Sequence, residues 1–212
     1  MANVLKREKQ EAVIAGLVEG ASVRSIERMT GVHRDTVLRL MVRVAGACAR
    51  YSDETLRDLP CQRIEVDEIW AYVAKKQRNV EPWDNPQLVG DQYTFVALDP
   101  ETKLIPSWRV GKRTADTTWD FMLDLRSRLR NRVQLSSDAF EPYFNAVDAT
   151  FHGQVDYAQI VKTYEETPSG RGRYSPPRIV SVEKDDKIGW PDMSARRTSS
   201  VRTSPSACRY VA

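Results

Sequence analysis

The chain is poor in the residues that build disulfide frameworks and zinc sites. Its 212 residues include three cysteines, Cys48, Cys61 and Cys208, and two histidines, His33 and His152. The cysteines are odd in number and far apart, and no Cys-x-x-Cys pair occurs. We therefore expect reduced thiols, and neither a disulfide framework nor a structural zinc site.

Long hydrophobic runs are missing as well. No stretch reaches the roughly 20 apolar residues that a membrane span needs, and the charged residues 1–10 do not resemble a secretory signal. The composition, 41% hydrophobic and 29% charged, excludes a collagen, a coiled-coil rod and a wholly disordered chain. We expect a cytoplasmic protein with one domain of ordinary size and a smaller one.

The net charge of +3 is unevenly distributed along the chain. Residues 1–57 contain ten basic and seven acidic residues, and residues 194–212 contain four arginines and no acid. The part of the chain between them is mildly acidic. The N-terminal segment is therefore the expected contact for a polyanion such as DNA.

Apolar residues at helical spacing predict three short helices near the N-terminus, over residues 5–19, 22–29 and 34–51. Ser22 is a suitable N-cap for the second helix, and Gly31 permits a tight turn before the third. This order predicts a helix-turn-helix, in which the third helix presents its first residues to a DNA groove. The residues expected to contact DNA are His33, Arg34, Thr36 and Arg39. The alternative is a plain three-helix module that packs or dimerises.

Beyond residue 59 the pattern changes to alternating apolar and polar residues rich in β-branched and aromatic types, which predicts a mixed α/β sheet. The expected strands are residues 63–73, 93–98, 104–110, 133–138 and 155–161, with a small further strand at 179–182. The expected helices cover residues 114–129 and 142–151.

Two aspartates in this region are candidates for a metal site. Asp67 lies on the first expected strand and Asp138 at the end of the fourth, so the two carboxylates meet if these strands are neighbours. Mg²⁺ prefers such oxygen ligands, and two ions about 3.5–4 Å apart assist both oxygens in phosphodiester chemistry. The alternative is that both are ordinary strand-end residues. Strand alternation directs Glu68 to the opposite face, so we expect a structural role for it.

Three segments carry a resemblance to a known family. They read RIEVDEIWAYV (residues 63–73), LDPETKLIPSW (98–108) and NRVQLSSD (131–138). Together they resemble the DDE-type transposases of bacterial insertion sequences, in particular the insertion-sequence-one group and its relatives, and the resemblance runs from about residue 6 to residue 192.

This resemblance implies an RNase H-like fold and DNA cleavage and strand transfer at the element ends. It also implies two Mg²⁺ or Mn²⁺ ions, with Asp67 and Asp138 as the catalytic carboxylates that bind them. The implied partners are terminal-repeat and target DNA, and a homo-oligomer is expected. The implied location is the nucleoid, within the cytoplasm.

The chain departs from the family towards its C-terminus. Relatives carry a third carboxylate, a glutamate on a helix after the fifth strand in a stretch like His-Val-Glu-Arg-Gln-Asn, and no residue here matches it. Codons can be chosen for residues 195–199 so that another reading frame gives His-Val-Glu-Arg-Gln, which suggests a frameshift.

We therefore expect a helix-turn-helix domain over residues 1–57 and an incomplete RNase H-like domain over residues 58–193 that lacks its final helix. A disordered, out-of-frame tail is expected over residues 194–212. Such a chain would be a weak or inactive transposase. The alternatives are a DNA-binding regulator of transposition that acts through the helix-turn-helix, and an unstable product of an inactivated gene.

Overall fold

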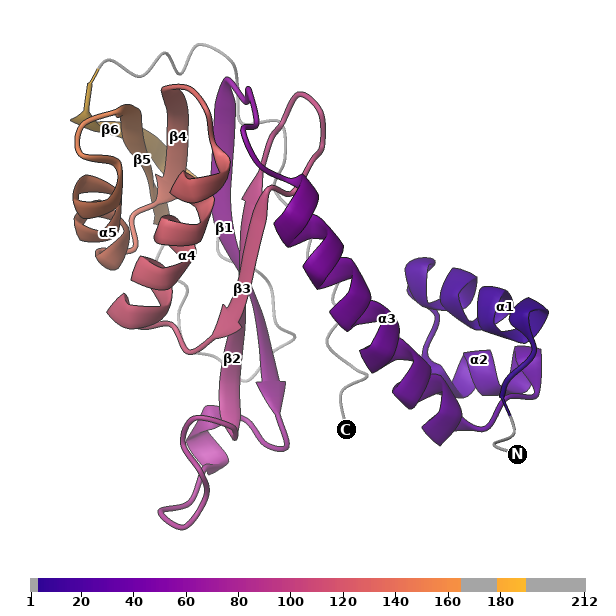
Figure 1. Ribbon diagram of the computed structural model, residues 1–212. Helices are drawn as coiled ribbons and strands as arrows, with labels where there is room; N and C mark the ends of the chain where they lie inside the picture. The colour runs from indigo at the N-terminus through magenta and orange to yellow at the C-terminus, as the bar shows by residue number, and fades with distance from the viewer. Residues whose placement is uncertain (1–3, 165–178, 190–212) are drawn as a thin grey trace. The chain divides into compact units, whose positions relative to one another are not determined.

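The computed structural model describes residues 4–164 and 179–189 (Figure 1). These residues divide into two compact parts, each with its own hydrophobic core. We call residues 4–56 the helical segment, and residues 57–164 with 179–189 the sheet segment. The tail predicted at residues 194–212 lies outside the described residues.

The helical segment consists of α1 (Arg7–Val18), α2 (Val23–Thr30) and α3 (Arg34–Thr55), and the third helix is four residues longer than the pattern predicts. Local signals set the helix ends. The Ser22 side chain accepts a hydrogen bond from the N–H of Ser25 at 3.2 Å at the start of α2. Gly31 ends that helix with a φ of 68°, which favours glycine. Five apolar residues form the core: Val13, Ile26, Val32, Val37 and Leu40.

The sheet segment contains a six-stranded sheet in the order β3-β2-β1-β4-β5-β6. Its strands are β1 (Arg63–Val73), β2 (Gly90–Leu98), β3 (Ser107–Gly111), β4 (Val133–Asp138), β5 (Val155–Tyr164) and β6 (Ile179–Ile188). Strands β1, β2 and β3 pair antiparallel, β4 and β5 run parallel to β1, and β6 is antiparallel to β5. The predicted mixed α/β class is confirmed.

The structure corrects the bounds of several predicted strands in the sheet segment: β2 begins at Gly90 and not at residue 93, β3 begins at Ser107 and not at residue 104, and β5 ends at Tyr164 and not at residue 161. Two further differences concern β6 and the loop before β2. Strand β6 extends to Ile188, six residues beyond the predicted end, because a run of charged residues after Val182 hides any apolar alternation on this exposed strand. The expected loop between β1 and β2 contains a short 3-10 turn, Gln77–Asn79.

Two helices, α4 (Ala115–Arg128) and α5 (Pro142–Phe151), lie side by side across one face of the sheet (Figure 1). The core lies between these helices and the strands. From β1, the alternate residues Ile64 and Val66 point into it and are fully buried. The largest other side chains there are Phe95, Phe121, Tyr143, Phe151 and Tyr157. By the same alternation, the next residue of β1 on the helix side is Glu68.

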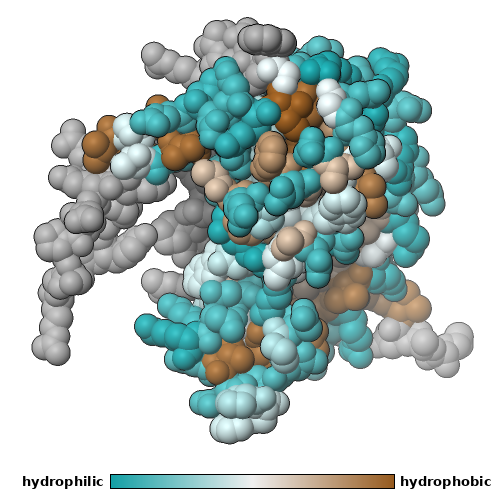
Figure 2. Space-filling view, turned by 90° about the vertical axis from the view of Figure 1, so that its left-hand side faces the viewer, coloured by the Kyte–Doolittle hydropathy of each residue, from teal (hydrophilic) through white to brown (hydrophobic). Residues whose placement is uncertain are grey.

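Among the described residues, no helix is both long enough and apolar enough to cross a bilayer. On the face drawn in Figure 2, hydrophilic residues make up most of the surface, and the hydrophobic ones form separate areas within it.

Candidate functional site

The sheet brings the two predicted aspartates to the same place. Strand β4 is the parallel neighbour of β1, with Ile64 opposite Leu135 and Glu65 opposite Ser136. The same register, continued by two residues, sets Asp67 level with Asp138. Both side chains line a pocket of about 450 Å³ at the end of β4. The other lining residues are Arg113, Ala139, Phe140, Glu141, Ile160, Val161 and Lys162.

One carboxylate oxygen of each aspartate accepts a hydrogen bond from a backbone N–H that is one or two residues further along the chain. Asp67 Oδ1 accepts from the N–H of Glu68 at 2.9 Å, and Asp138 Oδ1 accepts from the N–H of Phe140 at 3.1 Å, in the turn that leads to α5. The second oxygen of Asp138, Oδ2, lies 3.3 Å from Nη2 of Arg113. These bonds orient the carboxylates at the sheet edge, where the carboxyl ends of parallel strands commonly bind ligands.

Glu68 belongs to the same group of residues, which the sequence did not indicate. Its side chain is only 5% exposed, and its Oε2 lies 3.5 Å from the same Arg113 nitrogen that contacts Asp138. Alternation does direct Glu68 away from the face of Asp67. However, β4 ends at this point, and Arg113, from the connection between β3 and α4, reaches both faces at once.

Three carboxylates thus act on one another in this region. Burial raises the pKa of Glu68, and the negative charges of Asp138 and Asp67 raise it further, against the opposing effects of the Tyr143 hydroxyl and Arg113. The pKa of Tyr143 is also raised well above its ordinary value, first by burial and then by the charge of Glu68. A concentration of negative charge of this kind attracts cations.

Two buried polar atoms here make no hydrogen bond of normal geometry, although the Tyr143 hydroxyl is close enough to lower the pKa of Glu68. They are Oε1 of Glu68 and the hydroxyl oxygen of Tyr143. A buried polar atom without a partner costs about 1–3 kcal/mol. Buried atoms of this kind need an explanation, and a catalytic or ligand-binding role is one that the neighbouring pocket supplies.

The residues present fit a divalent cation held by few protein ligands. Mg²⁺ is commonly bound by one or two carboxylates and several waters, and Asp67 and Asp138 line one pocket. Within residues 4–164 and 179–189, no three His, Cys, Asp or Glu side chains are already arranged to bind one ion. In the same residues β5 is followed by β6, and no helix follows β5 that could carry the third carboxylate of the resemblance.

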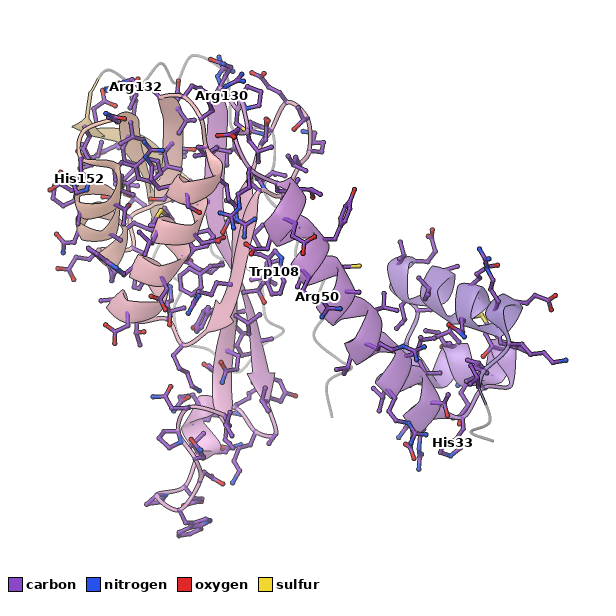
Figure 3. The ribbon with its side chains drawn as sticks, viewed as in Figure 1. His33, Arg50, Trp108, Arg130, Arg132 and His152 are labelled. Atoms are coloured by element: carbon purple, nitrogen blue, oxygen red, sulfur yellow. The ribbon has the colours of Figure 1, made fainter. Side chains whose placement is uncertain are left out.

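The predicted DNA-contacting residues lie together at the start of α3 (Figure 3 labels His33). His33 is the N-cap, and its Nδ1 accepts a hydrogen bond from the N–H of Asp35 at 3.3 Å. Arg34 and Arg39 are exposed, and Arg39 Nη2 donates to Oγ1 of the half-buried Thr36 at 3.4 Å. Arg34 Nε in turn lies 3.9 Å from Oδ1 of Asp35, so all four residues have a partner within α3, and the two arginines are the exposed positive charges among them.

The sequence and the structure were compared with those of known proteins. No family model matches the sequence, and no curated protein is significantly similar to it. Solved structures show a weak similarity to the Mos1 transposase. One is a Mos1 paired-end complex with the left transposon end, at a TM-score of 0.31 and 13% identity over 74% of this chain and 60% of that chain. The other is a Mos1 mariner paired-end complex with Mn, at 0.30 and 15% over 72% and 58%. The chain spans about 60% of the length of these structures.

Proposed function

We propose that the sheet segment is the RNase H-like catalytic domain of a DDE-type transposase of insertion-sequence type, and that it cleaves and joins DNA with a divalent metal. The observation that carries this proposal is the position of Asp67 and Asp138. Each lies two residues beyond the last paired residues of the neighbouring parallel strands β1 and β4, Glu65 with Ser136, and both line one pocket. Strand order and the sequence resemblance are consistent with it.

Each pocket residue then has a defined task. Asp67 and Asp138 would hold Mg²⁺ or Mn²⁺, which when bound stabilises the charge that develops on the phosphodiester oxygens. The Lys162 side chain lines the same pocket and offers a positive charge to the DNA backbone. The activity of this chain is expected to be low, because two carboxylates without a third hold a pair of ions poorly.

The test is metal-dependent nicking of DNA that carries insertion-sequence ends. We expect Mn²⁺- or Mg²⁺-dependent nicking by the unmodified chain, and a loss of at least about 100-fold in Asp67→Asn and in Asp138→Asn. Asp148→Asn, on the exposed face of α5, makes the same charge change away from the pocket and is expected to leave the rate unchanged. Equal nicking by all four proteins would overturn the proposal.

A second candidate function is favoured by the exposed arginines of α3. A helix-turn-helix that contacts DNA through Arg34 and Arg39 could act as a regulator that occupies the element ends without cutting them. Loss of a base-contacting arginine costs about 1–3 kcal/mol, or about 5- to 150-fold in affinity. We therefore expect Arg34→Ala and Arg39→Ala to weaken DNA binding to this extent.

Arg50→Ala is the matched control for these variants, because Arg50 is exposed on the same helix far from its start (Figure 3). It is expected to change the affinity less than twofold. Tight binding without metal-dependent nicking would favour the regulator over the enzyme. DNA affinity that is equal in Arg34→Ala, Arg39→Ala and Arg50→Ala would exclude α3 as the contact.

A further inference from the structure

Arg113 is held more loosely than the other arginines that are paired with carboxylates in the sheet segment. Its Nη2 lies 3.3 Å from Asp138 and 3.5 Å from Glu68. By contrast, two nitrogens of Arg132 donate to Asp156 at 2.9 and 2.7 Å, and two of Arg128 donate to Asp124 at 2.8 Å each. Charge-assisted hydrogen bonds are typically about 2.7–2.9 Å long. The contacts of Arg113 with its two carboxylates are therefore weak ones.

Arg113 also has a second partner that does not depend on the carboxylates. Its guanidinium carbon lies 3.7 Å from the centre of the Phe140 ring, a cation–π contact. The side chain is 34% exposed and lines the pocket beside Asp67. If the carboxylates take another cation, Arg113 keeps Phe140 and water as partners, which lowers the cost of its displacement.

Glu68, in contrast to Arg113, has too few partners for its surroundings. A buried carboxylate is costly unless paired charges and hydrogen bonds satisfy it. Only Oε2 of Glu68 contacts Arg113, and Oε1 is buried without a hydrogen-bond partner. The Tyr143 hydroxyl is the other polar group that acts on Glu68, and it makes no hydrogen bond of normal geometry either. Glu68 therefore has a buried oxygen, Oε1, that could accept or bind a further partner besides Arg113.

We propose that Glu68 is a third carboxylate of the acidic site, and that Arg113 occupies the cation position between Glu68 and Asp138 until a divalent metal displaces it. A single nitrogen lies within 3.5 Å of both carboxylates, so both side chains already converge on one point. A hard divalent ion matches this oxygen set better than one weakly bonded guanidinium nitrogen. This inference rests on the proposed function.

The test is Mn²⁺ binding to the full chain, measured by titration calorimetry at one pH. Glu68→Gln is expected to weaken Mn²⁺ binding at least about 10-fold, because loss of even an outer-shell partner typically costs 10- to 100-fold in metal affinity. Arg113→Gln is expected to tighten it at least about fivefold, since a competing positive charge is removed.

Two matched controls lie outside the pocket. Glu65→Gln makes the same change on β1, three residues from Glu68 and on the other face of the sheet, and Arg130→Gln removes an exposed arginine beyond the far end of α4 (Figure 3). Both are expected to bind Mn²⁺ within twofold of the unmodified chain. Circular dichroism checks that each variant is folded. If Glu68→Gln is unfolded, Glu68→Asp, which keeps the charge but shortens the side chain, is expected to weaken binding as well.

The outcomes separate this inference from the proposed function. Unchanged Mn²⁺ binding in a folded Glu68→Gln or Glu68→Asp would overturn the role of Glu68, and weaker binding in Arg113→Gln would overturn that of Arg113. If Asp67→Asn and Asp138→Asn lose Mn²⁺ binding while Glu68→Gln keeps it, only the further inference fails. Absence of Mn²⁺ binding in the unmodified chain would overturn both.

Discussion

The helical and sheet segments differ in what they bury. Among residues 4–56 no charged side chain is buried, whereas the sheet segment buries Asp99, Arg128 and the side chain of Glu68. Two of these are explained by the fold. Asp99 accepts the N–H groups of Glu101 and Thr102 in a turn, and Arg128 is paired with Asp124. Glu68 is not fully satisfied. Of these three buried charges, the one that the fold does not explain is therefore the one beside the pocket.

The largest expected effect is the loss of unfolding free energy when a core residue of either segment is truncated. Phe121→Ala empties a fully buried position of the sheet segment and is expected to cost about 3–5 kcal/mol of unfolding free energy. Ile26→Ala does the same in the helical segment at about 2–5 kcal/mol. Four of the five tryptophans lie in the sheet segment and none among residues 4–56, so tryptophan fluorescence reports the sheet segment and not the helical segment in a denaturant titration.

We expect Phe121→Ala to shift the fluorescence transition, and Ile26→Ala to shift only the helical signal measured by circular dichroism. The unmodified chain, monitored with both signals, is the reference. If Ile26→Ala moves the fluorescence midpoint as far as Phe121→Ala does, the two cores unfold as one cooperative unit and the division into segments is wrong.

The next prediction compares the reactivity of one cysteine from each segment, Cys61 and Cys48. Burial, and secondly the negative charge of Asp99, raise the pKa of Cys61 to about 11, so about one thiol in a thousand is ionised at pH 8. Cys48 is exposed on α3. Because the thiolate is the reactive form, iodoacetamide is expected to modify Cys48 at least about 100-fold faster than Cys61.

Mass spectrometry of the labelled peptides, in a Cys208→Ser background, measures this ratio. In concentrated guanidinium chloride the two rates are expected to converge, because the burial of Cys61 is lost. Similar rates in the folded protein would show that the core around Cys61 opens to reagent.

The smallest expected effect is on the stability of the sheet segment, which depends on pH through a half-buried ion pair. Burial acts to raise the pKa of Asp124, but hydrogen bonds from Arg128 and Ser107 outweigh it, so the pKa lies below its ordinary value. Stability from this carboxylate is therefore present above its unfolded pKa, about 3.9, and is lost as the pH falls through the folded pKa.

Asp124→Asn is expected to lower the unfolding free energy at pH 7 by about 1–3 kcal/mol, and the difference should shrink below about pH 4. Asp120→Asn, on the same helix, removes an exposed pair with Arg109 and is expected to cost less than about 1 kcal/mol. Fluorescence-monitored denaturation at several pH values checks both. A difference that does not depend on pH would contradict the assigned role of the Asp124 charge.

The sequence predicted the order and approximate bounds of the helices and strands, because the signals for them lie within a few residues of one another. Ser22 bonds to Ser25, Thr114 to Thr117, and Gly31 ends the helix directly before it. The prediction was wrong for the length of β6, whose charged exposed residues carry no apolar pattern.

For the candidate site, the chain pattern indicated Asp67 and Asp138 but missed Glu68 and Arg113. Alternation along β1 predicts on which face Glu68 lies, but it does not predict that strand β4 ends beside Glu68. Arg113 is 25 residues from Asp138 in the chain, and nothing in its local sequence relates the two.

By itself, then, the amino-acid sequence determined which segments are helices and strands, where the caps fall, and that Asp67 lies on a strand and Asp138 at the end of one, since these follow from interactions between residues close in the chain. Only the tertiary structure decided that β1 lies beside β4, that Glu68 is buried next to Asp138, and that Arg113 lies between them. The reason is physical. Burial, sheet register and charge pairing depend on distances between segments far apart in the chain, and these are fixed only when the core packs.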